Sequence, residues 1–347
     1  MSRTSSSPCD PAPGIGLYGL VFTALLVGCA SHGPRYAPDH APDYAPERSV
    51  ELAGTPFFAQ DEYLCGPAAL ATVLHATGVQ VSPDQLAHQL YLPKRRGSLQ
   101  LELVAATRGY ERLAVRIEPS LQSIVDELDD GRPVLVLQNL GVRVFPIWHY
   151  AVVVGYDSDS HSFVLRSGST RRRIMKYKRF ARTWRSADNW GLVILRPGEL
   201  PASRDHHAYA SAVASLETMQ HYESARVAYQ AGLQRWADSP VLMLGYANAL
   251  HGLNDLHSAV GAYRRVLSKY PRNIPAANNL AQTLGELGCR DEALEVVEEI
   301  SPAAARSKFA AALATTRSSL IEAEGTTCRL AEFGAHKRAG ISELSAR

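Results

Sequence analysis

One cysteine in this sequence stands where a protein can use a thiol as a nucleophile. Cys65 is followed by Gly66 and Pro67, and the small and apolar residues behind them predict a buried helix that closes at Gly78. Pro67 suits the first turn, where N–H groups are unpaired, and Gly66 would let the backbone approach a substrate carbonyl. These N–H groups and the helix dipole favour a thiolate. We therefore expect the pKa of Cys65 to be lowered.

A nucleophilic thiol needs a base, and four nearby histidines follow Cys65 in the chain. His75 lies on the same helix about 15 Å away, which is too far. His88 fits the surface of the next helix, and His161 falls in a turn. His149 opens the β-branched run HYAVVVGYD, where the edge of a sheet can face a helix N-terminus. We expect His149 to act as the base.

Residues 51–198 must position this pair, and their helical signals come before their strand signals. Helices are expected after Ser82 and Ser98, each serine serving as an N-cap. β-Branched runs separated by turn residues then follow at 133–139, 149–157, 162–168, 171–177 and 190–197. This order predicts an α+β domain in which helices pack on an antiparallel sheet.

The motifs QDEYLCGPAAL and HYAVVVGYD, in this order and spacing, resemble papain-like cysteine peptidases of the bacteriocin-processing, double-glycine type. The resemblance spans roughly residues 55–197. It implies Cys65 as nucleophile, His149 as general base and acid, and a thiolate–imidazolium pair that hydrolyses a peptide or protein substrate. It also implies that Gln60 and the backbone N–H of Cys65 form the oxyanion hole. Gln60 stands five residues before the cysteine, where the family more often has six.

The third catalytic position departs from the family, which usually has Asp or Asn on the strand after the histidine strand. That place reads VLRSGS here, so Ser167 matches best, and Asp157 at the end of the histidine strand is a poorer alternative. A serine can accept the imidazole N–H but offers no charge to an imidazolium. We expect a weaker or narrowly tuned enzyme, and the alternative is a peptide-binding envelope scaffold with little or no turnover.

The N-terminal part has the pattern of an exported protein. Residues 14–28 form an apolar run of signal-peptide length that ends in LVGC, a junction resembling the lipobox of bacterial lipoproteins. The resemblance implies a signal peptide at 1–28, a lipid on Cys29 and, because Ala30 follows, an outer membrane location facing the periplasm. Residues 29–50 repeat Ala-Pro every four residues, which predicts an extended tether.

From residue 205 the sequence repeats with a period of 34. Three sets of equivalent residues carry this period: Ala225, Ala259 and Ala293; Leu216, Leu250 and Leu284; Tyr229, Tyr263 and Val297. The spacing resembles tetratricopeptide repeats, with three units over 205–307 and a capping helix and tail over 308–347. Such an array implies a surface for a peptide or protein partner, or a purely structural cap.

Composition and cysteine spacing limit the classes of partner and cofactor that this protein can be expected to use. The formal net charge is +2, so nothing favours a nucleic-acid partner. Five scattered cysteines argue against a disulfide framework, and without CxxC or HExxH spacing we expect no metal or other cofactor. The basic run at 171–179 is expected to be a solvated hairpin face, with contact to an acidic peptide or lipid headgroups as the alternative.

Overall fold

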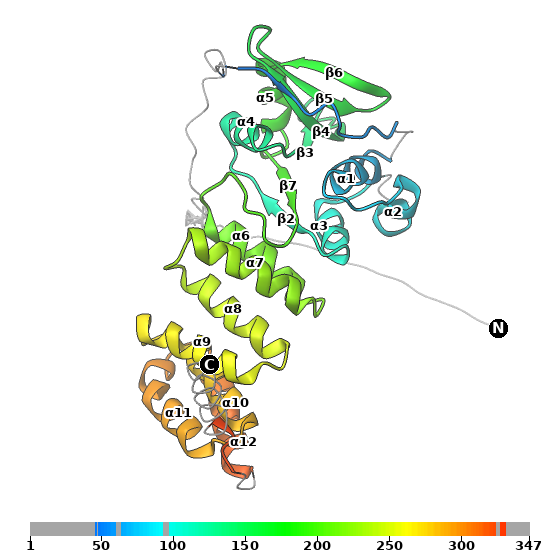
Figure 1. The fold of residues 1–347 in the computed structure, drawn as a ribbon. Coiled ribbons are helices and arrows are strands. Elements are labelled where there is room, and N and C mark those ends of the chain that lie inside the picture. The colour runs from blue at the N-terminus through cyan, green and yellow to red at the C-terminus, as the bar shows by residue number, and fades with distance from the viewer. Residues whose placement is uncertain (1–45, 47, 60–63, 93–96, 324–326, 331–347) are drawn as a thin grey trace, which may run out of the picture. The chain divides into compact units, whose positions relative to one another are not determined.

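The computed structural model describes residues 46, 48–59, 64–92, 97–323 and 327–330. An antiparallel sheet with helices on both faces comes first in the chain, and a helical array follows it (Figure 1). The expected fold class is therefore confirmed. Gln60, Cys29 and the expected signal peptide and tether, apart from residues 46 and 48–50, lie outside the described residues. Among the described helices, none has the length and hydropathy that a membrane span requires.

The sheet has seven strands, and all of its pairings are antiparallel. Its main order is β2-β7-β3-β4-β5-β6, and β1 pairs with the far end of β4. The strands are β1 Val50–Glu51, β2 Leu113–Arg116, β3 Val134–Asn139, β4 Trp148–Asp157, β5 Ser162–Ser167, β6 Thr170–Lys176 and β7 Gly191–Leu195. Five of them correspond to the expected runs, and the two short strands β1 and β2 were not anticipated.

Five helices cover the two faces of the sheet: α1 Cys65–Ala76, α2 Pro83–Leu90, α3 Gln100–Gly109, α4 Leu121–Asp129 and α5 Tyr177–Arg185. Residues of α1, α2 and α3 share one apolar cluster with one face of the sheet, and residues of α4 and α5 share another with the opposite face (Figure 1). Ser82 caps α2 as expected. The cap expected at Ser98 is wrong, because Leu99 is the N-cap of α3 and the buried Ser98 hydroxyl has no partner among the described residues.

Seven further helices form three successive pairs and a last single helix. They are α6 His206–Glu217, α7 Tyr222–Arg235, α8 Pro240–Gly252, α9 Leu256–Lys269, α10 Ile274–Glu286, α11 Arg290–Ala304 and α12 Ala310–Glu322. The equivalent residues Ala225, Ala259 and Ala293 are fully buried, one in each pair. Small side chains at these positions let the two helices of a repeat pack closely.

The first helical pair shares a core with the sheet. Leu113 and Val115 of β2 lie in the same buried cluster as Tyr209 and Val213 of α6. The linker between β7 and α6 is also fixed to this part of the protein, because the buried Glu127 carboxylate accepts the N–H of Ala202 at 2.8 Å. The start of the helical array is therefore packed onto the sheet by apolar contacts that neither part could bury alone.

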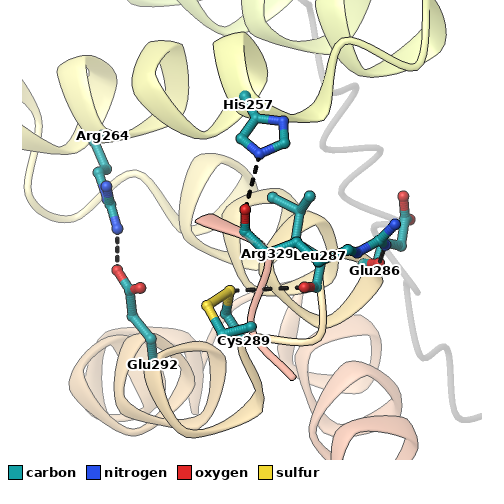
Figure 2. The surroundings of a disulfide bond; sticks show 8 residues. His257, Arg264, Glu286, Leu287, Cys289, Glu292 and Arg329 are labelled. Carbon is teal, nitrogen blue, oxygen red and sulfur yellow. Dashed lines mark hydrogen bonds and ion pairs between the residues drawn. A yellow bond between two sulfur atoms is a disulfide. The ribbon is translucent and has the colours of Figure 1, made fainter. Parts of the chain in front are cut away.

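A single disulfide joins Cys289 to Cys328, a pairing that the sequence analysis, which argued only against a disulfide framework, did not predict. Arg329, the residue after Cys328, donates its N–H to the carbonyl of Leu287 at 3.0 Å. Its own carbonyl contacts the ring of His257 at 3.3 Å (Figure 2). The bridge thus ties the segment after α12 back to the turn between α10 and α11.

Removing this bridge should destabilise the array. The two cysteines are 39 residues apart, and closing a loop of that size stabilises a fold by about 2–4 kcal/mol in the chain-entropy model. We expect Cys289→Ser to lower the thermal unfolding midpoint. Adding a reductant should not lower the midpoint of this variant any further, because it has no bridge left to reduce. Cys65→Ser is the matched control, which should keep the reductant-sensitive midpoint. An unchanged midpoint in Cys289→Ser would show that the bridge adds no stability.

Candidate active site

Cys65 is the first residue of α1, as expected, and Leu64 is the N-cap. It is half-buried and is the only free cysteine among the described residues. Burial raises the pKa of its thiol, and the backbone N–H groups of Tyr150, Gly66 and Cys65 itself lower the pKa by a smaller amount. The expected lowering is therefore wrong: the N–H groups at the helix start do act on the sulfur, but loss of hydration outweighs them.

Gly66 is required by the packing of α1 against the start of α3. A Cβ atom at this position would lie 2.8 Å from both Cβ and Oγ of Ser98, closer than side chains tolerate. The sequence had pointed to close approach of a substrate as the reason for a glycine here. Contact with Ser98 is a second reason, which only the fold reveals.

His149 lies at the start of β4, directly opposite Gln138 of β3. Its Nε2 is 2.9 Å from the hydroxyl oxygen of Ser167, which leaves Nδ1 for another partner. Burial, followed by the charge of Arg173, lowers the pKa of His149 to about 4. The imidazole is therefore neutral near pH 7.

The start of α1 and the start of β4 lie close together, because Ser98 adjoins Gly66 and its carbonyl accepts the hydroxyl of Tyr150 at 3.3 Å. Cys65 packs against the apolar cluster that contains Tyr150, the residue after His149. No hydrogen bond joins Cys65 to His149 in the part of the chain that the structure describes. Catalytic hydrogen bonds often tighten only when substrate binds, so the lack of a direct bond is compatible with proton transfer between the two groups.

Ser167 and not Asp157 is the residue beside the imidazole. Asp157 is eight residues along β4 from His149, about 26 Å at the usual rise of a strand. Its carboxylate accepts the N–H of Ser160 at 3.0 Å. Ser167 is 2 % exposed, so water competes little for its bond to His149. The catalytic roles of these residues and of Gln60 remain predictions.

The other histidines occupy structural or exposed positions. The Nε2 atom of His75 is 2.9 Å from the carbonyl oxygen of Val81, and its ring stands edge-on to Phe58. His88 is exposed on α2, and His161 sits in the β4–β5 turn with Nδ1 near the carbonyl oxygen of Asp159. None of these contacts places a ring beside the thiol.

Two polar residues near the thiol were missed by the sequence analysis. Tyr150 is buried, and its hydroxyl donates to the carbonyl of Ser98 at 3.3 Å. Burial raises its pKa, and the nearby charges of Cys65 and Glu102 raise it further. One carboxylate oxygen of Glu102 is buried without a partner among the described residues. The sequence offered little reason to single out Tyr150 and Glu102, because tyrosines are common in strands and glutamates are common in helices.

The pKa of His149 predicts the acid side of a pH–rate profile. His149 can accept the thiol proton only while it is neutral, so kcat/KM should fall as the pH drops through about 4. Ser167→Asp should move this limb to higher pH, because a carboxylate beside the ring favours imidazolium and raises its pKa. Peptide hydrolysis measured from pH 3 to 8 checks both expectations. If the wild-type kcat/KM instead begins to fall above pH 6, Cys65 and His149 would not both be neutral before substrate binds.

Comparisons with known proteins found similar solved structures for the part of the chain that contains the sheet. A search of curated proteins found no match. The solved structures of a C39-like peptidase from Bacillus anthracis and of the Streptococcus ComA peptidase domain are 18% and 25% identical. They cover 43% and 41% of this chain, and the chain covers 98% and 96% of them, with TM-scores of 0.37 and 0.33.

The helical part has neighbours of its own among solved structures. The TPR2B domain of yeast Sti1, in its pHsp70 complex, is 16% identical and covers 35% of this chain. The chain covers 98% of that domain, with a TM-score of 0.33. A sequence model of the Peptidase_C39 like family matches residues 53–191, under half of the chain but including Cys65, His149 and Ser167. This chain therefore carries a Peptidase_C39-like domain.

Proposed function

We propose that this protein is a cysteine peptidase of the cell envelope that hydrolyses peptide bonds through Cys65 and His149. One observation carries the proposal: Ser167 lies 2.9 Å from Nε2 of His149, and the next residue along β4, Tyr150, bonds to Ser98 beside the start of α1. The imidazole is thereby oriented by one neighbour, and its other nitrogen is left for the thiol that we propose as its partner. The Peptidase_C39-like match over the same residues supports this reading.

The chemistry begins from a neutral pair and not from a preformed ion pair. When Ser167 accepts the Nε2–H of His149, the lone pair is left on Nδ1. Nδ1 takes the thiol proton as the sulfur attacks the peptide carbonyl, and the imidazolium then protonates the leaving amine. Water, activated by the same ring, releases the acyl group from Cys65. The N–H of Cys65 and the side chain of Gln60 are the donors proposed for the oxyanion.

We extend the proposal to location and to the repeats. A disulfide persists in oxidising compartments, so the Cys289–Cys328 bridge supports an extracytoplasmic site. The LVGC junction supports a lipid on Cys29 that holds the protein to the outer membrane, facing the periplasm. The helical pairs are proposed to recruit a substrate or protein partner to the peptidase domain.

Inhibition by alkylation tests the peptidase proposal. Peptide mixtures should be cleaved by the purified chain, and iodoacetamide should stop cleavage in proportion to modification of Cys65. The bridged Cys289 and Cys328 resist the reagent and act as internal controls. Cleavage that survives full modification of Cys65 would refute the proposal.

A peptide-binding scaffold is the second candidate. Among the described residues, the hydrogen-bond partner of His149 is Ser167, and this favours a scaffold because a serine cannot stabilise an imidazolium as a carboxylate does. A scaffold would bind peptides with the same affinity before and after alkylation of Cys65 and would release no products. Slow turnover that accelerates in Ser167→Asp would instead identify a weak enzyme.

A further inference from the structure

The loop between β3 and β4, together with the first residue of β4, holds five large apolar side chains out to solvent. Val142, Val144, Phe145, Ile147 and Trp148 are 61%, 77%, 77%, 61% and 54% exposed. We call residues 140–148 the apolar hairpin. Exposed apolar side chains gathered in one segment mark a surface that binds something, since single ones are ordinary but groups are not.

The backbone of the apolar hairpin is bonded to itself. The side-chain oxygen of Asn139 accepts the N–H groups of Gly141 and Ile147, both at 3.0 Å. Val142 and Phe145 exchange two backbone hydrogen bonds at 3.1 and 3.2 Å. Gly141 has no room for a side chain, because a Cβ would lie 2.3 Å from the carbonyl oxygen of Phe145. The fold thus holds these side chains outward.

The apolar hairpin leaves the sheet at the end where the candidate active site lies. Trp148, its last residue, precedes His149, and Asn139 pairs with Trp148 across the two strands. Tyr150, the next residue along β4, donates its hydroxyl to the carbonyl of Ser98, which adjoins Gly66 at the start of α1. A peptide bound across the thiol and the imidazole must therefore pass beside this hairpin.

Peptide fits this surface better than a lipid bilayer does. Val50, where the described chain enters the sheet from the side of Cys29, pairs with Tyr156 of β4. Tyr156 is seven residues from His149, about 23 Å along the strand. The chain that comes from the proposed anchor thus joins the sheet far from the apolar hairpin. Only Arg143 is charged within the hairpin, so apolar side chains dominate what it can bind.

We propose that the apolar hairpin binds large apolar side chains of the substrate next to the scissile bond, so that it sets the sequence preference of the peptidase. This inference rests on the proposed function. The tip residues Val144 and Phe145, the two most exposed, are expected to cover those side chains. Apolar contact area removed from water supplies the preference.

A double substitution at the tip tests the proposal. Two peptide series should be compared, one with Leu or Phe beside the scissile bond and one with Ala there. We expect V144S/F145S to lose about tenfold in kcat/KM for the first series, as the loss of partly buried apolar contacts implies. Hydrolysis of the Ala series and alkylation of Cys65 by iodoacetamide should stay unchanged. M219S/L253S, at exposed apolar positions in the helical array, is the matched control.

The outcomes separate the two proposals. Hydrolysis with the same apolar preference in V144S/F145S overturns the role of the hairpin and leaves the peptidase standing. If no peptide is cleaved, the Kd of the Leu and Phe series for Cys65→Ala is measured instead. A Kd weakened about tenfold by adding V144S/F145S would support the binding role of the hairpin and refute the peptidase proposal. The third outcome concerns membranes and uses the unlipidated C29A chain with phosphatidylglycerol vesicles. If this chain binds the vesicles, and V144S/F145S loses that binding but keeps the peptide preference, the hairpin contacts membranes and the proposal is overturned.

Discussion

Cys65→Ala is expected to abolish peptide hydrolysis by the purified protein. The sulfur is the atom that forms the covalent bond to substrate, and alanine has no atom that can replace it. Cys65 packs at the start of α1 beside small residues, so losing one sulfur atom should leave the fold intact. The measurement is kcat/KM on a cleaved peptide, with circular dichroism to establish folding.

Cys289→Ser provides the control for Cys65→Ala. It also removes a sulfur atom, but from the bridge in the helical array, and it should keep hydrolysis within twofold of the wild type at a temperature where the array is folded. In cells, envelope peptides that depend on this protein should disappear with Cys65→Ala and persist with Cys289→Ser. Residual hydrolysis by folded Cys65→Ala would place the nucleophile elsewhere.

His149→Ala is expected to lower kcat/KM by about 10²- to 10⁴-fold, the usual contribution of a positioned acid–base group. The effect should be near the top of this range, because burial keeps the Cys65 thiol protonated without a base to remove its proton. Steady-state kinetics at pH 7 measure the loss. Raising the pH should recover part of the activity, because hydroxide can then ionise the thiol.

His88→Ala is the matched control for His149→Ala. His88 lies exposed on α2 in the same domain, and its loss should leave kcat/KM unchanged. The double variant C65A/H149A should be no less active than C65A alone, because the two groups act in one step. Equal losses in His88→Ala and His149→Ala would mean that the substitutions act through the fold and not through the proton.

The sequence predicted the elements that carry the candidate site better than those that surround them. The helix at Cys65, the strand at His149 and the period of the repeats all have strong apolar patterns, and each was found where expected. β2 escaped notice because it has four residues, too few for a clear alternation. Helix α5 was hidden in a basic run, although Phe180 and Trp184 on one of its faces are buried.

Features that depend on three-dimensional proximity could not be read from the chain. The Cys289–Cys328 bridge joins residues 39 positions apart, and their pairing follows from how the last segment returns to α10. The pKa of Cys65 was assigned the wrong direction because a helix start can be recognised in sequence, whereas the burial around it cannot. Ser167 was chosen as the partner of His149 by family position, and the structure places it there at 2.9 Å.

Thiol labelling tests most directly whether Cys65 and His149 act as a pair. The full chain is treated at pH 7 with a peptide that carries a vinyl sulfone in place of its scissile bond, and mass spectrometry follows modification of Cys65. We predict labelling much faster than that of free cysteine, lost in His149→Ala and kept in His88→Ala. Labelling no faster than free cysteine, or equally fast without His149, would contradict the account.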